Sequence, residues 1–494
     1  MSKHLDVLIV GAGLSGIGAA YHLQRDCPGK TYAILEARQA IGGTWDLFRY
    51  PGIRSDSDMY TLGYNFKPWT NPKAIADGPS IRDYIRETAR ENGIDRHIRY
   101  GHKILKSSWS TADALWTVDV QHVDSGKTEQ LTCNFLWMCT GYYKYDKGYT
   151  PDFAGRDSFK GTIIHPQHWP ENLDYSGKKV VIIGSGATAV TLVPAMTDKA
   201  AHVTMLQRSP TYIATIPEKD PIATNLRRFL PEKMVYRITR AKNVSLTLGF
   251  FNLAKKRPAP VRRLLLGMVK RQLKGSVDMK HFTPSYNPWD ERLCAVPDGD
   301  LFKVLRQGKA SVVTDHIDRF DETGIKLKSG QHLEADIIIT ATGLDLQILG
   351  GMTVEKDGQP FDMTSVMNYK GIMFENLPNL AMIFGYTNAS WTLKADISSE
   401  YICRLLNHMD KTCRKIATPM NTDPTVEKES FVEMHSGYIQ RALSKLPKQG
   451  NKAPWKVYMN YMLDLGILRY KPIDDGVMRF SSPSGATAKV RKAA

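Results

Sequence analysis

Residues 5–23 read LDVLIVGAGLSGIGAAYHL, and the fold class follows from them. A short apolar run, typical of a buried strand, leads into Gly11-x-Gly13-x-x-Gly16, and a helical pattern follows. In this context the first glycine permits a tight turn, the second lets the backbone approach a pyrophosphate, and the third lets helix and strand pack closely. The N–H groups at the start of the helix favour the phosphates. The stretch therefore predicts a dinucleotide-binding, Rossmann-like domain.

A second strand and a second glycine loop extend this pattern. The strand KTYAILEA ends near Glu36, twenty residues after Gly16, where a carboxylate accepts hydrogen bonds from a ribose diol and repels a 2′-phosphate. The stretch KKVVIIGSGATAVTLVPAM repeats the first motif, with Gly184, Gly186 and Ala189 in the three positions. We therefore expect two nucleotide sites in one chain.

The strand after the second loop ends in Arg208 and Ser209 and carries no acid at this point. A guanidinium binds a phosphate through two hydrogen bonds, so this position suits the 2′-phosphate of NADP. An ordinary surface arginine is the alternative. The first loop thus favours a nucleotide with a free ribose, and the second favours NADP.

Each unit ends in a similar stretch, an apolar run followed by Thr-Gly. The first is TCNFLWMCTG, which ends at Gly141, and the second is LEADIIITATG, which ends at Gly343. We predict an α/β protein with two Rossmann-like dinucleotide-binding domains in tandem, the second interrupted by a basic helical insertion. The expected boundaries are 1–145 and 380–494 for the first nucleotide-binding domain, 150–212 and 291–345 for the NADP-binding domain, 213–290 for the insertion and 346–379 for a connection.

The basic charge of the chain is local. The formal net charge is +16, and residues 221–275 hold fourteen lysines and arginines against one acid, Glu232. A solvated helical face is one interpretation, and a basic amphipathic surface that meets anionic lipid is the other. Nucleic acid is not an expected partner, because no reading motif accompanies the charge.

Neither the cysteines nor the apolar runs indicate a metal site or a membrane span. The six cysteines form no C-x-x-C pair and show no metal-type spacing, so we predict reduced thiols and no metal. The N-terminus lacks a signal-peptide pattern, and the longest apolar stretch is broken by glycines. We expect a cytoplasmic protein, with peripheral membrane contact through residues 221–275 as a further option.

The loop IGGTWDLFRYPGIRSDSD, residues 41–58, favours FAD in the first domain. Its paired glycines allow a second close backbone approach to phosphates or flavin, and its aromatic residues are suited to line a flavin ring. Without a redox dithiol, oxygen is the expected electron acceptor. The residues of this loop expected on the FAD side are Gly43, Thr44, Trp45 and Asp56.

Between the two domains stands FKGTIIHPQHWP, residues 159–170, which resembles the F-x-G-x-x-x-H-x-x-x-W-P signature of type I Baeyer–Villiger monooxygenases, a group of class B flavoprotein monooxygenases. The loop at 41–58 matches the second signature of that family, G-G-x-W followed by an aromatic-Pro-Gly and an acid. Stretches such as GYTNASWTLKAD also resemble one bacterial branch of it. The signature positions are Phe159, Gly161, His165, Trp169 and Pro170.

The resemblance implies an FAD- and NADPH-dependent enzyme that uses O2 to convert ketones to esters or lactones through a C4a-peroxyflavin. It also implies activity on sulfides and thioamides, and small-molecule substrates of the ketone or sulfide type. Arg292 is implied as the cation beside the flavin, and Asp56 as the group that orients it. His165 is implied as a pivot between the domains, with a catalytic proton role as the less favoured alternative.

Two further features bear on the nucleotide and substrate sides. Several members of the family carry lysine where this chain has Glu291, so the preference for NADPH should rest on Arg208 and be weaker. Asn388 and Trp391 are expected near the flavin and substrate, with ordinary core and helix-cap roles as the alternative.

Two other functions stay open at this level. One is a flavin-containing monooxygenase that acts only on nitrogen or sulfur nucleophiles. The other is a non-catalytic, flavin-binding redox sensor docked on a membrane. The sequence assigns neither the physiological substrate, nor the regioselectivity, nor the oligomeric state.

Overall fold

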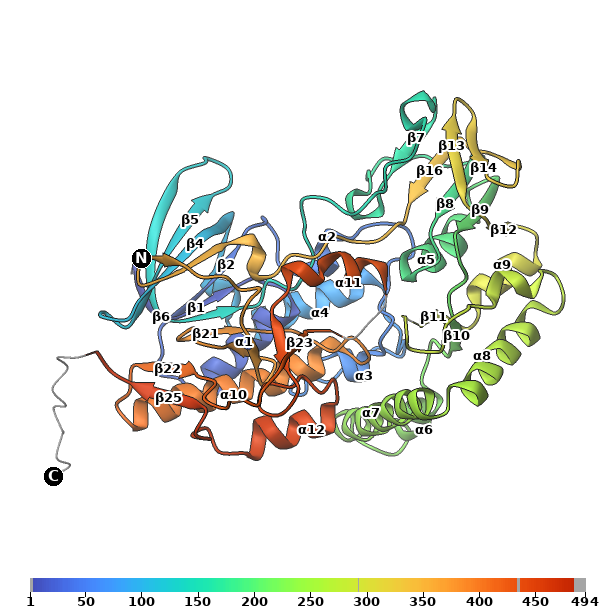
Figure 1. The fold of residues 1–494 in the computed structure, drawn as a ribbon. Coiled ribbons are helices and arrows are strands. Elements are labelled where there is room, and N and C mark those ends of the chain that lie inside the picture. Colours follow the sequence, from blue (N-terminus) through green and yellow to red (C-terminus); the bar gives the residue numbers. More distant parts are fainter. Residues whose placement is uncertain (1–2, 292, 433–435, 484–494) are drawn as a thin grey trace.

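The computed structural model describes residues 3–291, 293–432 and 436–483 of the chain, and they form two α/β units joined by a helical layer (Figure 1). Each unit is built on a sheet with the parallel β-α-β arrangement that the glycine loops predict. The prediction of an α/β fold with two Rossmann-like units is confirmed.

The first sheet has eleven strands among the described residues. They come from widely separated parts of the chain, between residues 4 and 382. Its main order is β18-β17-β4-β5-β6-β1-β2-β3, and β21, β20 and β19 continue from β6. Helices α1 (Leu14–Asp26) and α10 (Trp391–Lys411) pack against each other beside it, with α4 (Gly78–Glu91) next to α1. The strands are β1 (His4–Val10), β2 (Tyr32–Glu36), β3 (Ile98–Tyr100), β4 (His102–Ser110), β5 (Leu115–His122), β6 (Thr128–Met138), β17 (Thr353–Lys356), β18 (Gln359–Pro360), β19 (Asn368–Tyr369), β20 (Met373–Phe374) and β21 (Leu380–Met382).

The segment 346–379, predicted as a connection, adds four short strands to this first sheet. β17 pairs in parallel with β4, and Val354 is buried in the same core as Trp109. The added strands have two to four residues each. Such short strands leave no apolar run that sequence reading can recognise, because their stability comes from the sheet they join.

The second sheet has five parallel strands in the order β12-β9-β8-β16-β7. Its interior strand β16, which lies between β8 and β7, is buried along its whole length, as expected for a parallel sheet covered on both faces. The elements are β7 (Thr162–Ile164), β8 (Lys179–Ile183), α5 (Ala187–Met196), β9 (His202–Gln207), α9 (Asp300–Arg306), β12 (Ala310–Thr314) and β16 (Ile337–Thr340), with the small antiparallel sheet β13 (Ile317–Asp321), β14 (Gly324–Leu327) and β15 (His332–Glu334) beside them.

The insertion forms three helices between the paired strands β10 (Ile213–Ile216) and β11 (Cys294–Pro297). In Figure 1 the helices follow the lower right edge of the molecule from one unit to the other. They are α6 (Pro221–Leu226), α7 (Glu232–Lys256) and α8 (Pro258–Leu273). The remaining described elements are α2 (Thr44–Leu47), α3 (Met59–Leu62), α11 (Gly437–Ala442), α12 (Tyr461–Leu465), β22 (Ile416–Pro419), β23 (Lys428–Ser430), β24 (Lys448–Gly450) and β25 (Met478–Ser481).

Arg240 fastens the insertion to the first unit. This residue of α7 donates through its guanidinium to the carbonyls of Tyr60 at 2.8 Å and Gly63 at 2.7 Å, which lie in and after α3. It also contacts the carboxylate of Asp396 on α10 at 3.3 Å, and that carboxylate is 3% exposed. The insertion therefore belongs in sequence to the second unit but packs against the first.

We expect Arg240→Ala to lower the free energy of unfolding by about 3 kcal/mol, because the change leaves the Asp396 carboxylate buried without its main cation. Urea unfolding followed by circular dichroism measures the loss. Arg237→Ala, one turn earlier on the exposed side of α7, is the matched control and should cost less than about 0.5 kcal/mol. Equal losses in the two variants would contradict the role given to Arg240.

Candidate active site

Both glycine loops open into one cavity between the two units. Its volume is about 1780 Å³, larger than the roughly 300–1,000 Å³ that holds one drug-sized ligand. Its lining includes Gly13 and Glu36 from the first unit and Gly186 and Arg208 from the second. The arrangement therefore has room for two nucleotides that meet in the middle.

The first loop is an open cradle of backbone. A Cβ on Gly16 would lie 1.8 Å from the carbonyl oxygen of Gly11, and a Cβ on Gly43 would lie 3.0 Å from the Cα of Gly13. The N-terminus of α1 has no side-chain cap, so its N–H groups are left to a ligand. These features fit a dinucleotide pyrophosphate.

Glu36 stands at the end of β2 on the wall of the cavity. Its carboxylate accepts the backbone N–H of Ala12 at 2.8 Å and that of Arg38 at 2.9 Å. Burial raises the pKa of Glu36, and these two N–H groups act in the opposite direction. Since a carboxylate has further lone pairs, Glu36 retains acceptor capacity for a ribose, and the ribose contact stays a prediction.

The loop after β2 reaches from the first unit to the second. Thr44 Oγ1 lies 3.3 Å from the hydroxyl of Tyr145, while Trp45 lines the cavity and packs against the first core. At Gly52, φ is +76° and a Cβ would meet Ala195 of α5 at 2.7 Å, so only glycine fits. The aromatic-Pro-Gly part of the signature therefore serves the contact between the units.

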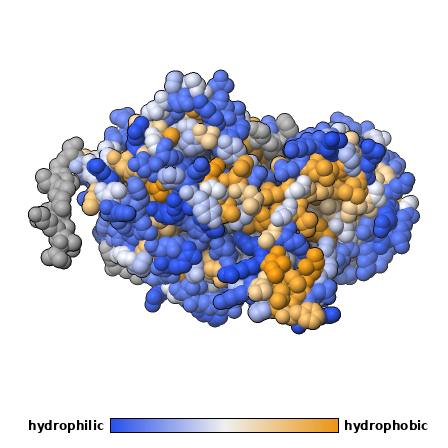
Figure 2. All heavy atoms as spheres, turned by 90° about the horizontal axis from the view of Figure 1, so that it is seen from below, coloured by the Kyte–Doolittle hydropathy of each residue, from blue (hydrophilic) through white to orange (hydrophobic). Residues whose placement is uncertain are grey.

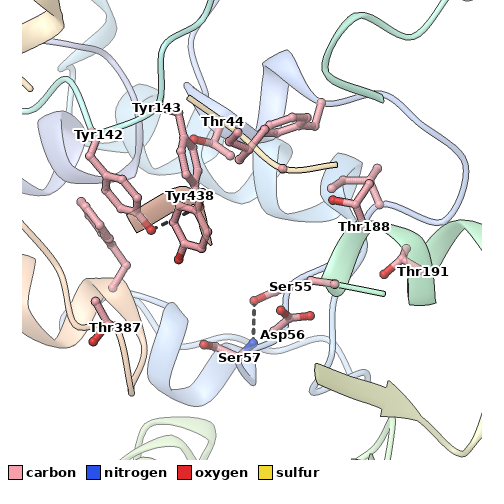
Figure 3. A pocket seen from close by; sticks show the side chains of 18 of the residues that line it. Thr44, Ser55, Asp56, Ser57, Tyr142, Tyr143, Thr188, Thr191, Thr387 and Tyr438 are labelled. Atoms are coloured by element: carbon pink, nitrogen blue, oxygen red, sulfur yellow. Dashed lines mark hydrogen bonds between the residues drawn. The ribbon is translucent and has the colours of Figure 1, made fainter. Parts of the chain in front are cut away.

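Asp56 lies at the cavity wall between Ser55 and Ser57 (Figure 3). The backbone N–H of Ser57 donates to Ser55 Oγ at 3.0 Å, which closes a tight turn. Arg292, the predicted partner of Asp56, lies outside the described residues, so their pairing is untested. Its neighbours Glu291 and Leu293 both line the same cavity.

The second loop differs in how much space it leaves. At Gly184, φ is +139° and a Cβ would lie 2.3 Å from the Ala341 carbonyl, whereas a Cβ on Gly186 would meet nothing within 4 Å. Gly186 is also the uncapped N-terminus of α5, whose buried Ala189 permits close packing. The open space above Gly186 fits a pyrophosphate.

Arg208 and Ser209 follow β9 at the rim of this second cradle. Both line the cavity, and the side chain of Arg208 is exposed. Ser185 in the loop donates its hydroxyl to the Ser209 carbonyl at 3.2 Å, so the rim is held to the cradle. This is the position from which a guanidinium could reach a 2′-phosphate, and that contact stays a prediction.

His165 lies at the junction of the two units. Its Nε2–H donates to the carbonyl of Gly343 at 3.1 Å, and its Nδ1 accepts the N–H of Gln167 at 3.2 Å. The ring lies against Gly148, where a Cβ would come within 1.9 Å of it. Burial lowers the pKa of His165. The burial and the bond accepted at Nδ1 favour the neutral imidazole, while the bond to Gly343 acts in the opposite direction. The role as a pivot stays a prediction.

The rest of the signature holds this junction in place. Phe159 is buried in the core of the second unit, and Trp169 packs at the edge of a neighbouring core. A Cβ on Gly161 would lie 2.3 Å from the carbonyl of Asp336, while Pro170 is exposed. No metal ligands surround His165 among the described residues.

Sequence reasoning missed Gln167, which is 1% exposed inside the same segment. Its amide donates to the carbonyls of Lys144 at 2.8 Å and Tyr145 at 3.0 Å. Its place within the signature was the only available signal. Gln167 therefore links His165 to residues 144–145, and the hydroxyl of Tyr145 in turn lies beside Thr44 in the loop 41–58.

Several cavity residues from the C-terminal part were also missed. Arg441 stacks over the ring of Tyr149, 3.4 Å from its centroid, and both line the cavity. Figure 3 shows Tyr142, Tyr143 and Tyr438 gathered on one side of the cavity. No motif marks these residues, because they are brought together by the return of the chain to the first unit.

Asn388 and Trp391 line the cavity, as expected, and both also have structural contacts. Asn388 donates to the carbonyl of Met459 at 2.9 Å, and Trp391 donates to Ser15 Oγ at 2.7 Å. The indole is stacked on Tyr142 at 5.2 Å. Cavity and core roles thus coexist at these positions.

Strand pairing creates one group of possible metal ligands that spacing in the sequence did not suggest. His102 on β4 lies opposite His122 on β5, and Glu129 on β6 is next to both. Their ligand atoms lie within 4.8 Å of one another.

Within the described ranges, no helix combines the length and the apolar character needed to cross a bilayer.

Two dinucleotide cradles facing one cavity define a flavin- and pyridine-nucleotide-type oxidoreductase fold. Residues 70–382 match the flavin-binding monooxygenase-like family, and residues 9–71 match an NAD(P)-binding Rossmann-like domain. The chain is 56% identical over 483 residues to the FAD-containing monooxygenase EthA of Mycobacterium tuberculosis, covering 97% of this chain and 98% of EthA. The chain belongs to the flavin-binding monooxygenase-like family.

Solved structures share the fold. Steroid monooxygenase bound to NADP superposes with a TM-score of 0.76 at 20% identity, and cyclohexanone monooxygenase bound to ε-caprolactone with 0.74 at 18%. Each comparison covers 97% of this chain and 100% of the other. The predicted resemblance to one bacterial branch of the family is confirmed by the similarity to EthA, and the prediction of FAD and NADP as cofactors is confirmed at the level of the family.

We expect Gly186→Ala to weaken NADP⁺ binding at least about tenfold, or about 1.4 kcal/mol, while leaving the thermal midpoint unchanged. The added methyl group meets no protein atom and occupies the space assigned to the pyrophosphate. Isothermal titration with NADP⁺ and anaerobic flavin reduction by NADPH measure the effect. Gly249→Ala on α7, also in open space, is the control, and unchanged NADP⁺ affinity in Gly186→Ala would refute the assignment.

A pH dependence follows from the neutral His165. Because its pKa in the folded protein lies below the ordinary value of 6.5, the unfolded chain binds this proton more readily, and the stability it contributes declines as the pH falls below 6.5. The stability difference between the wild type and His165→Gln should therefore shrink as the pH is lowered. Urea unfolding at several pH values tests this, and a difference that is constant across the range would count against it.

Proposed function

We propose that this protein is an FAD- and NADPH-dependent Baeyer–Villiger monooxygenase, which inserts one oxygen atom of O2 into ketones to give esters or lactones. The observation that carries the proposal is the F-x-G-x-x-x-H-x-x-x-W-P segment. Its His165 and Gln167 bond to Gly343 and Lys144, which lie in the two chain segments that connect the units. The likeness to a caprolactone-bound neighbour is consistent with it, because a lactone is the product of such a reaction on a cyclic ketone.

The first cradle would hold FAD and the second NADPH. Bound flavin would supply two-electron redox chemistry between the nicotinamide and O2. The chain holds the phosphates with the helix N-termini at Gly13 and Gly186, and it distinguishes the riboses with Glu36 and Arg208. Preference for NADPH rests on Arg208, since Glu291 at the cavity wall adds a negative charge.

Arg292 is the proposed catalytic cation. A guanidinium that stays charged at any working pH stabilises negative charge developing on oxygen during attack on a carbonyl. Asp56, which lines the cavity, is proposed to orient it. Sulfides and thioamides are proposed as further substrates, because oxidation at sulfur does not need that cation.

Two alternatives remain distinguishable. A flavin-containing monooxygenase restricted to nitrogen and sulfur nucleophiles would form sulfoxides and no esters. A non-catalytic redox sensor would bind flavin and give no oxygenated product.

The proposal also includes a cytoplasmic location, with peripheral contact to a membrane through residues 221–275.

Product analysis decides between these functions. The FAD-loaded protein with NADPH, air, 2-decanone and thioanisole should yield octyl acetate, with or without the sulfoxide, by gas chromatography with mass detection. Sulfoxide alone would favour the restricted monooxygenase, and the absence of both products would favour the sensor.

We expect Arg292→Ala to reduce ester formation by about 10²–10³, the cost of losing one charge-stabilising donor. Flavin reduction by NADPH should continue, because hydride transfer precedes the step that needs the cation. Stopped-flow absorbance measures reduction, and Arg156→Ala at an exposed position is the control. Equal loss of both steps in Arg292→Ala would remove its proposed role.

A further inference from the structure

The underside of the helical insertion exposes an unusual concentration of apolar side chains. Fifteen large apolar residues are exposed among those the structure describes, and eight of them lie within residues 221–275. Figure 2 looks at the underside of Figure 1, where α6, α7 and α12 lie, and shows apolar residues gathered in one patch with hydrophilic residues around it. The eight are Ile222, Phe229, Met234, Ile238, Leu246, Leu253, Leu264 and Met268.

The patch continues onto the neighbouring C-terminal segment. Met462, Leu463 and Tyr470, in and after α12, are 58%, 50% and 73% exposed. Tyr461 packs with Val244 of α7 in one small cluster, so the two segments are adjacent. A contiguous apolar surface of this kind marks a docking site more often than a solvated face.

Positive charge accompanies the apolar side chains. Of the fourteen basic residues in 221–275, five are tied to the protein, for example Arg240 to Asp396 and Lys242 to Asp220. The other nine are exposed, and none of them makes an ion pair with an acidic side chain of the described ranges. These nine are Arg228, Lys233, Arg237, Lys256, Arg257, Arg263, Lys270, Arg271 and Lys274.

The same surface reaches the cavity. Ile222 and Leu246 are 49% and 63% exposed and are at the same time cavity-lining residues, so they stand at its mouth. Phe250, one turn further along α7, also lines the cavity. An apolar path therefore leads from the underside of the insertion to the space between the nucleotide cradles.

We propose that this face rests on an anionic lipid surface and that the cavity takes its substrate from that surface, past Ile222 and Leu246. Basic side chains meet the headgroups while apolar side chains enter the interface, as in other interfacial helices. The substrate class is a lipophilic ketone or sulfide with a long alkyl chain. The lipid part specifies the peripheral membrane contact proposed above and does not depend on the monooxygenase activity, whereas the substrate part rests on that proposed activity.

Vesicle binding tests the lipid part. The FAD-loaded full chain should co-sediment with vesicles of phosphatidylcholine and phosphatidylglycerol, bind phosphatidylcholine alone at least about tenfold more weakly, and be released by salt. The triple variant Arg263→Glu/Arg271→Glu/Lys274→Glu should lose binding at least about tenfold. The control Arg156→Glu/Arg319→Glu/Lys328→Glu, which makes the same charge change on the far end of the second unit, should retain it.

The apolar contribution has its own variant, Phe229→Ser/Leu253→Ser, which should weaken vesicle binding while thermal unfolding stays the same. Equal losses in the two charge-reversed triples would mean attraction to net charge alone and overturn the proposal. So would a lack of vesicle binding accompanied by a lower sedimentation mass in Phe229→Ser/Leu253→Ser, since the face would then join two copies of the chain.

A kinetic comparison tests the substrate part separately. With a long-chain ketone supplied in anionic vesicles, the Arg263→Glu/Arg271→Glu/Lys274→Glu variant should raise KM about tenfold or more and leave kcat unchanged. With a short, water-soluble ketone it should match the wild type. Unchanged KM for both ketones would overturn entry from the lipid, whereas an enzyme that binds vesicles but oxidises neither ketone would refute the proposed function and leave lipid docking intact.

Discussion

The hydrogen bonds between the two chain crossings decide how the two cradles face each other. The chain leaves the first unit after β6 and returns after β16, and the two crossings pair with each other where Tyr143 lies opposite Leu346. The N–H of Lys144 donates to Asp345, and that of Tyr149 donates to Gly343. His165 and Gln167 add side-chain bonds to the same two crossings. A shared cavity exists because both crossings are fixed at one place.

The insertion adds a second constraint of a different kind. Its ends emerge from the paired strands β10 and β11 beside the second sheet, while Arg240 and Tyr236 bond to the segment around α3 in the first unit. A rotation of the second unit must therefore be absorbed both at the crossings and at the ends of the insertion. The ion pair between Arg54 and Asp300, at 2.5 Å, spans the same division. Motions that preserve these contacts are hinge rotations about the crossings rather than separation of the units.

The sequence was most informative where the physics is local. A turn with positive φ and a close backbone approach require glycine within a few residues, so both cradles and Glu36 could be predicted from a short window. The Arg240 contacts with α3, the Gln167 bonds and the short strands in 346–379 were not predictable in this way. Each depends on residues that are far apart in the chain, and a lone arginine or glutamine looks the same whether its partner is water or a distant carbonyl. The signature segment was recognised as a pattern, but only the structure shows that the Gln167 side chain donates two of the hydrogen bonds that hold the segment in place.

The two cradles are alike in backbone and opposite in charge, and this difference matters for a shared cavity. At one end Glu36 is buried and held by two N–H groups, so a 2′-phosphate placed there would meet a desolvated carboxylate. At the other end Arg208 is exposed at the rim, where its positive charge would attract a 2′-phosphate. If both ends accepted either nucleotide, three of the four possible arrangements would differ from the productive one. The proposed assignment of FAD to the first cradle and NADP to the second therefore rests on opposite charges at equivalent positions of the two folds.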